Sequence, residues 1–117
     1  MGGNLEMLRS TRDFTALQER SRGRSHALLS VRMRRNELGH DRYGIATSRK
    51  LGGAVIRNRV RRRIRAIVRT EQWPARAGWD ILVVARGASV TASYEDLRST
   101  LLALIASVAM KEGTVTE

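Results

Sequence analysis

The apolar residues of this chain recur with two different periods, and each period predicts one type of element. Strand-like patterns, either alternating or continuously apolar, occupy residues 26–33, 42–47 and 79–86. Ala27, Leu29 and Val31 alternate with more polar neighbours, which is typical of a half-buried strand. The last of the three segments is a continuous β-rich run between turn residues, which favours a central strand. We expect a turn or short edge strand at residues 21–24 and a loop at residues 34–41.

A helical period dominates the middle of the chain. Apolar residues recur there at three- and four-residue intervals: Ile56, Val60, Ile64, Ile67 and Val68. At about 100° per residue, these positions share one side of an α-helix. Pro74 and Gly78 predict that this helix stops soon after Arg69.

Two further helices are predicted near the ends of the chain. Ser10 is the expected N-cap of a short helix over residues 11–18, with Phe14 on its inner side. Ser93 is the expected N-cap of a last helix, whose predicted core stripe is Tyr94, Leu97, Leu101, Leu104, Ile105 and Val108. The succession of strand, helix and strand predicts helices packed on a sheet.

Positive charge is concentrated in the first part of the chain. The sequence has 22 Lys and Arg against 11 Asp and Glu, a formal net charge of +11. Up to Arg69 there are 18 basic and 5 acidic residues, whereas the remainder has 4 basic and 6 acidic. Net charge indicates the kind of partner, here a polyanion. All but two of the basic residues are arginine, which suits bidentate phosphate contacts, although a GC-rich genome would produce the same bias.

The predicted central helix carries most of this charge on its polar side. No acidic residue lies between Arg49 and Arg69, so a merely solvated face would leave the mutual repulsion of the arginines unrelieved. We therefore expect the helix to bury its apolar stripe and to present its arginines to an external anion. Gly52 and Gly53 suit a tight entry turn that leaves the first helical amides open to phosphate.

Other functional classes lack support in the sequence. There is no cysteine, the longest apolar runs are shorter than the ~20 residues that a bilayer requires, and the N-terminus lacks a signal-peptide core. His26 and His40 are not at metal-ligand spacing. No P-loop, nucleophile elbow or catalytic triad is present. We expect a cytoplasmic protein without catalytic or metal-binding residues of its own, and with neither a membrane nor a small molecule as partner.

An ordered motif joins the second strand to the basic helix. The strand ends in Ser48-Arg49-Lys50, then Leu51-Gly52-Gly53-Ala54-Val55 follows, and then Arg57-Asn58-Arg59 and Arg61-Arg62. This order closely resembles the signature of the protein subunit of bacterial ribonuclease P, whose central helix carries an Arg-Asn-Arg motif. Matches at Asp13-Phe14, at the strand of residues 79–86 and at Ser93-Tyr94-Glu95 extend the resemblance over roughly residues 8–108.

The resemblance implies an α+β fold, an αβββαβα two-layer sandwich in which the basic helix makes a left-handed crossover between parallel strands. Such connections are right-handed in about 98% of cases, so general topology rules alone predict the opposite hand. With this fold, residues 1–8 are expected to be an N-terminal extension, residues 9–110 the ribonuclease P protein domain, and residues 111–117 a frayed tail.

The resemblance also implies a function, in which the protein binds a catalytic RNA that removes the 5′ leader of precursor tRNA. The RNA would carry the chemistry, with Mg²⁺ held mainly by RNA and substrate phosphates and none bound by the protein alone. The residues that match the family's contacts to the catalytic RNA are Arg49, Lys50, Arg57, Asn58, Arg59, Arg61, Arg62 and Arg65.

A second implied site is a cleft for the unpaired leader, between the first helix and the sheet. Phe14 matches an aromatic residue of this cleft, and the strand positions Ser30 and Ser48 are expected to line it. The chain departs from the family pattern here, because Gln18 and Ser30 stand where further aromatic residues often occur. We therefore expect less base stacking in this cleft and more contact through arginine.

Two other classes of protein remain as alternatives at this point. A ribosomal protein or RNA chaperone would share the charge and the mixture of helices and strands, but it would not stimulate leader removal. A DNA-binding regulator would require a recognition helix, and the predicted order of strand, helix and strand is not that of a helix-turn-helix protein.

Overall fold

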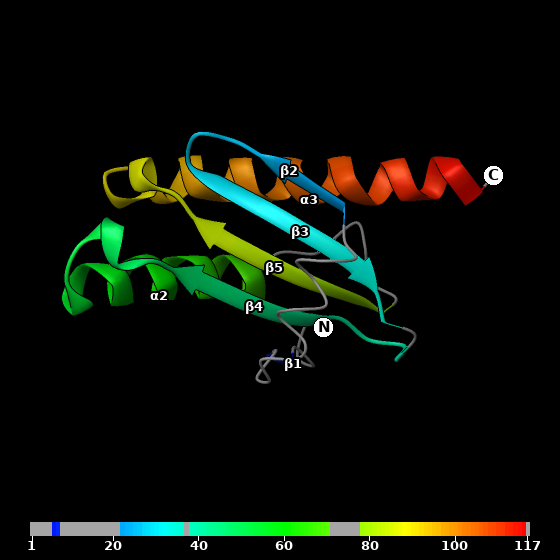
Figure 1. Cartoon of the computed structure of the whole chain (residues 1–117), viewed down its shortest axis with the longest axis horizontal. Helices are drawn as coiled ribbons and strands as arrows, with labels where there is room; N and C mark the ends of the chain where they lie inside the picture. Colours follow the sequence, from blue (N-terminus) through cyan, green and yellow to red (C-terminus); the bar gives the residue numbers. More distant parts are fainter. Residues whose placement is uncertain (1–5, 8–21, 37, 71–77, 117) are drawn as a thin grey trace.

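The structure, a computed structural model, describes residues 6–7, 22–36, 38–70 and 78–116 (Figure 1). The elements are β1 (Glu6–Met7), β2 (Arg22–Ser25), β3 (Leu29–Arg35), β4 (Arg42–Thr47), the 3-10 helix η1 (Arg49–Leu51), α2 (Ala54–Thr70), β5 (Trp79–Ala85), the 3-10 helix η2 (Gly87–Val90) and α3 (Tyr94–Thr116). The first helix predicted from the sequence, at residues 11–18, lies outside the described residues.

The predicted strands are confirmed, with a shift in β3. The prediction that this strand begins at residue 26 is wrong, because Leu28 N–H donates to His26 Nδ1 (3.1 Å) in a turn that leaves Ala27 exposed. The strand also continues through Arg35, where a loop was expected, since its last residues pair with Asp80 and Trp79 of β5. The short edge strand β2 agrees with its prediction.

The five strands form one sheet in the order β1-β4-β5-β3-β2, with β5 in the centre as predicted. β4 and β5 are parallel, and α2 connects them. In Figure 1 the arrows of β4 and β5 both point to the left, β5 lies above β4, and α2 passes behind the sheet. This path is the left-handed crossover that the resemblance implied, against the general preference for the right hand.

The hydrophobic core lies between the sheet and the two long helices. α3 packs on β3 and β2, while α2 packs on β4. Alternate strand residues face the helices and are fully or almost fully buried, among them Leu29, Val31, Met33, Tyr43, Ile81 and Val83. The helix α2 contributes Val60, Ile64, Ile67 and Val68 to the same cluster. Ile56, at the start of the predicted stripe, is half-buried.

The last helix begins as predicted. Ser93 Oγ accepts a hydrogen bond from Asp96 N–H (3.0 Å), which is an N-cap contact. The predicted stripe is buried from Leu97 to Val108, but the inclusion of Tyr94 was wrong, since this residue is 40% exposed at the first helical position. The helix continues through residues 111–116 of the expected tail.

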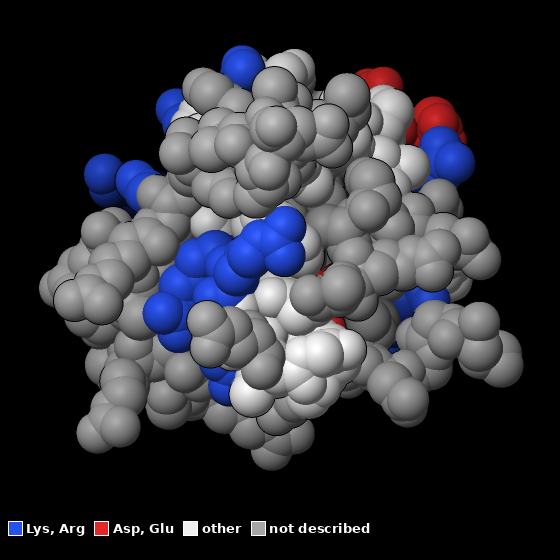
Figure 2. Space-filling model, turned by 90° about the vertical axis from the view of Figure 1, so that its right-hand side faces the viewer, with Lys and Arg blue, Asp and Glu red and all other residues white. Residues whose placement is uncertain are grey.

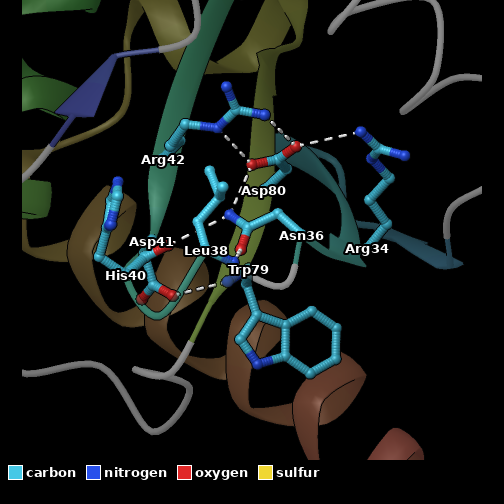
Figure 3. Close-up of polar contacts among 8 residues, drawn as sticks. All are labelled: Arg34, Asn36, Leu38, His40, Asp41, Arg42, Trp79 and Asp80. Atoms are coloured by element: carbon cyan, nitrogen blue, oxygen red, sulfur yellow. Dashed lines mark hydrogen bonds and ion pairs between the residues drawn. The ribbon is translucent and has the colours of Figure 1, made fainter.

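The other face of the sheet carries a buried carboxylate that joins three strands (Figure 3). Asp80 of β5 is 0% exposed. Arg42 of β4 donates to it through Nε and Nη2, both at 2.8 Å, and Arg34 of β3 lies at 3.4 Å. Asn36 Nδ2 donates to the same carboxylate at 2.8 Å. A single charge therefore fixes the start of β5 against both of its neighbours.

The surroundings of Asp80 determine its pKa. Burial by itself raises the pKa of this carboxyl, because it disfavours the charged form. The hydrogen bonds from Arg42 and Asn36, together with the charges of Arg42 and Arg34, outweigh burial and hold the pKa of Asp80 below its ordinary value. A lowered pKa means that the ionised form stabilises the folded state.

Replacement of Asp80 by asparagine should lower the free energy of unfolding at pH 7 by about 3 kcal/mol, because it removes the buried carboxylate that pairs with Arg42 and Arg34. This is the low end for a broken buried pair, since the two arginine side chains keep 17% and 29% of their exposure. Urea unfolding measures the change. Glu95→Gln is the matched control, because Glu95 pairs with Arg98 but is 70% exposed.

Acid should abolish the difference between the native protein and the Asp80→Asn variant. Because the pKa of Asp80 is lowered in the folded state, its stabilisation is complete above the unfolded pKa of about 3.9 and is lost as the pH falls through the folded value. A difference in unfolding free energy that stayed constant down to pH 2 would contradict the ion-pair explanation.

Candidate RNA-binding surface

The helix α2 buries a narrow apolar stripe and places its arginines around the rest of its circumference. Its buried residues recur at three- and four-residue spacing, so they lie on one side, against the sheet. Arg59, Arg62 and Arg69 are exposed, while Arg57, Arg61, Arg63 and Arg65 are half-buried at the flanks of the stripe. The predicted arrangement of the helix is confirmed.

The entry to α2 adds two more positive charges. Arg49 and Lys50 are exposed on η1, directly before the helix, and Ser48 is the residue preceding η1. Gly52 has φ 142°, and a Cβ there would lie 2.8 Å from Ile56 Cδ1, so only glycine fits this turn. The positive end of the helix dipole thus lies beside two cations, which favours a bound anion at this end.

Within the described residues, no carboxylate neutralises the basic residues of η1 and α2. The ion pairs found among the described residues lie elsewhere: Arg34 and Arg42 pair with Asp80, and Arg98 pairs with Glu95. The Nε–H of Arg57 is buried and finds no hydrogen-bond acceptor in this part of the chain. A buried donor without a partner costs roughly 1–3 kcal/mol.

Neutral groups of the protein hold two of the arginines of α2. Arg61 donates to Thr47 Oγ1 through Nη2 (2.6 Å) and to Asn58 Oδ1 through Nη1 (2.9 Å). Arg63, which was not among the predicted site residues, donates to the carbonyl oxygen of Ala92 (2.9 Å) and ties α2 to the loop before α3. None of these acceptors is ionised, so none of them offsets the positive charge of the two guanidinium groups.

The face of the sheet opposite the helices carries Ser30, one of the three residues predicted for the leader cleft. Ser30 and Arg34 alternate with buried residues of β3 and therefore point to this face, where Leu82 packs with Ala46 and Val84. Ser30 Oγ accepts a weak hydrogen bond from the Ser25 hydroxyl (3.3 Å). In Figure 2 this face lies to the left, and lysine and arginine side chains gather there and toward the centre.

The structure brings together most of the predicted site residues. Those of η1 and α2 form one continuous surface, whereas Ser30 and the strand end at Ser48 lie on either side of β5, about 10 Å apart across the sheet. Phe14 lies outside the described residues. Sequence reasoning missed Thr47, Arg34 and Arg42. The lone carboxylate of Asp80 within an apolar strand was a signal for the last two, because a buried charge requires a partner.

Within the described residues, no three His, Cys, Asp or Glu side chains lie close enough together to hold a metal ion. Neither α2 nor the described part of α3 has a stretch apolar enough to cross a bilayer.

Comparisons with known proteins give one consistent result. The sequence pattern of the family described as Ribonuclease P matches residues 3–109. The ribonuclease P protein component of Syntrophomonas wolfei is 34% identical over 98 residues, which cover 84% of this chain and 82% of that protein.

Solved structures agree with the sequence comparisons. The ribonuclease P protein of Thermotoga maritima superimposes with a TM-score of 0.77 at 30% identity, covering 86% of this chain and 94% of that one. The protein of Staphylococcus aureus gives a TM-score of 0.75 at 28% identity, covering 87% and 95%. With its αβ sandwich and basic central helix, this chain therefore belongs to the ribonuclease P protein family, whose members are subunits of the bacterial ribonucleoprotein that processes the 5′ end of tRNA.

Proposed function

We propose that the surface formed by η1 and α2 binds the catalytic RNA of ribonuclease P, and that the helix-free face of the sheet receives the 5′ leader of precursor tRNA. The observation that carries the first part is the run of basic residues without a carboxylate partner in the described part of the chain. The contacts proposed for the catalytic RNA come from Arg49, Lys50, Arg57, Asn58, Arg59, Arg61, Arg62 and Arg65.

The shape of the surface suits a folded RNA better than a flexible strand. The arginines lie on one rigid helix, which spans about 25 Å at 1.5 Å per residue, so they match phosphates at fixed spacing. Their exposure and charge supply affinity that does not depend on base sequence. Specificity would then come from the shape of the RNA backbone.

The leader site is proposed from residues on the opposite face. Ser30 and Ser48 offer small polar side chains whose hydroxyl groups can donate hydrogen bonds to a phosphate. Phe14 of the N-terminal segment adds one aromatic ring for stacking to this proposed set. The Mg²⁺ ions that the cleavage requires are proposed to be held by the catalytic RNA and by the phosphates of the precursor tRNA.

A cleavage assay tests the proposed function. Precursor tRNA is incubated with a bacterial ribonuclease P RNA at low Mg²⁺, with and without the protein. We expect the protein to stimulate release of the 5′ leader, and the triple variant with Arg57, Arg59 and Arg62 changed to alanine to lose the stimulation. Tight RNA binding without stimulation, across RNAs from closely related sources, would favour the ribosomal or chaperone alternative.

Single arginine variants should change the salt dependence of binding to the catalytic RNA. Arg59→Ala or Arg62→Ala should each weaken binding and make the slope of log K against log salt shallower by about one unit per lost phosphate contact. Filter binding over a range of KCl concentrations measures the slope. Arg98→Ala is the matched control, since Arg98 lies on α3 and pairs with Glu95. An unchanged slope in the α2 variants would mean that these side chains face bulk water.

Phe14→Ala should lower the affinity for leader-bearing precursor more than the affinity for mature tRNA. The expected loss is about 5- to 100-fold for the precursor, which corresponds to one stacked base. Binding of the two RNAs to the assembled ribonucleoprotein is measured, and circular dichroism establishes that the variant is folded. Equal losses for both RNAs would place Phe14 in the core instead of the leader site.

A further inference from the structure

Within the described residues, Arg61 is the one basic residue of α2 whose two terminal nitrogens both donate hydrogen bonds to the protein. Nη2 donates to Thr47 Oγ1 at 2.6 Å, and Nη1 donates to Asn58 Oδ1 at 2.9 Å. Thr47 is the last residue of β4, and Asn58 lies three residues before Arg61 on the same helix. Two elements that are separate in the sequence therefore converge on one guanidinium.

We infer that Thr47 and Asn58 are positioning residues, which hold the Arg61 guanidinium in a preset orientation for a phosphate of the catalytic RNA. This role rests on the proposed function of α2, since a positioned cation affects the reaction only if RNA binds there. Nothing in the sequence pattern marks Thr47 as a functional residue. Asn58 was proposed above to contact the catalytic RNA directly. The inference assigns its side-chain oxygen a different main role, which is to hold Arg61.

The chemistry of the two acceptors favours this role. A hydroxyl and an amide oxygen accept hydrogen bonds without neutralising the cation, whereas Asp80 neutralises the charge of Arg42. A guanidinium has five N–H donors, so the two contacts leave other donors for a phosphate. Arg61 is also half-buried, which weakens screening by water and strengthens its attraction for an anion.

Fixing the side chain before binding should increase affinity. A free arginine loses much of its rotamer freedom when it contacts a phosphate, and that loss opposes binding. Arg59 and Arg62 are exposed and have no hydrogen bond within the described residues, so they lose this freedom when RNA binds. Arg61 has already lost it in the folded protein. Its contribution to binding should therefore depend on Thr47, and the contributions of the other two should not.

A double-mutant cycle between Thr47 and Arg61 tests the inference. Thr47→Val removes the hydroxyl but keeps the β-branched shape that suits the end of a strand, and Thr47→Ser keeps the hydroxyl. Binding of the full-length protein to ribonuclease P RNA is measured at one fixed salt concentration. We expect Thr47→Val to weaken binding about 3- to 10-fold, the value of one hydrogen bond, and Thr47→Ser to weaken it less than about 2-fold. In an Arg61→Ala background, Thr47→Val should have no effect.

The salt slope separates a positioning role from a phosphate contact. Arg61→Ala should make the slope shallower by about one unit, whereas Thr47→Val should leave it unchanged, because the arginine and its charge remain. A Thr47→Val variant that binds RNA as tightly as the native protein would overturn the inference. So would an equal loss in the Arg61→Ala background, which would indicate a general effect on the fold.

The test also distinguishes this inference from the proposed function. If Arg61→Ala and the triple variant of Arg57, Arg59 and Arg62 both bind RNA normally, the proposed RNA-binding surface is wrong. If those variants lose affinity while Thr47→Val does not, the surface remains and only the positioning role fails.

Discussion

The whole arrangement depends on the attachment of a strongly cationic helix to the sheet by a narrow apolar stripe. The buried residues of α2 are Val60, Ile64, Ile67 and Val68, each worth about 1.5–3 kcal/mol of hydrophobic free energy. Repulsion between arginines one turn apart, such as Arg57 and Arg61, costs about 0.2–0.5 kcal/mol per pair. Burial therefore outweighs repulsion several-fold, and the helix is stable although no carboxylate of the described residues pairs with its cations. The folded protein accommodates this positive surface because the free energy of burying the apolar stripe exceeds the repulsion between the arginines.

The described arginines donate hydrogen bonds to two different types of acceptor, a carboxylate in the sheet and neutral groups around α2. In the sheet, Asp80 neutralises Arg42 and Arg34, which stabilises three strands and removes most of their attraction for an external anion. On α2, the acceptors are neutral groups of Thr47, Asn58 and Ala92, which restrict movement and preserve the charge. The type of acceptor thus separates structural arginines from arginines that can bind RNA.

The spacing of apolar residues predicted the elements that pack one face against the core. It failed where the limit of an element or a side-chain contact depends on a local hydrogen bond or on residues far apart in the sequence. The stripe of α2 and the limits of β4 follow from spacing alone. The turn at His26 depends on a side-chain hydrogen bond, so the start of β3 was misplaced. The contact of Arg42 with Asp80 requires the register of two parallel strands, and the contact of Arg61 with Thr47 requires the packing of α2 on β4. No local pattern contains either. The left-handed connection came from the family resemblance, because general rules favour the other hand.

The direct passage of β4 into η1 and α2 places part of the proposed leader site close to the proposed site for the catalytic RNA. β4 passes directly into η1 and α2, so the end of the strand lies beside the first turns of the basic helix. Successive residues of a strand point to opposite faces. Thr47 faces α2 and contacts Arg61, and Ser48, the next residue, has an extended backbone and an exposed side chain. The proposed surfaces for the catalytic RNA and for the leader are therefore close together at this strand end, where a substrate held by both could be aligned.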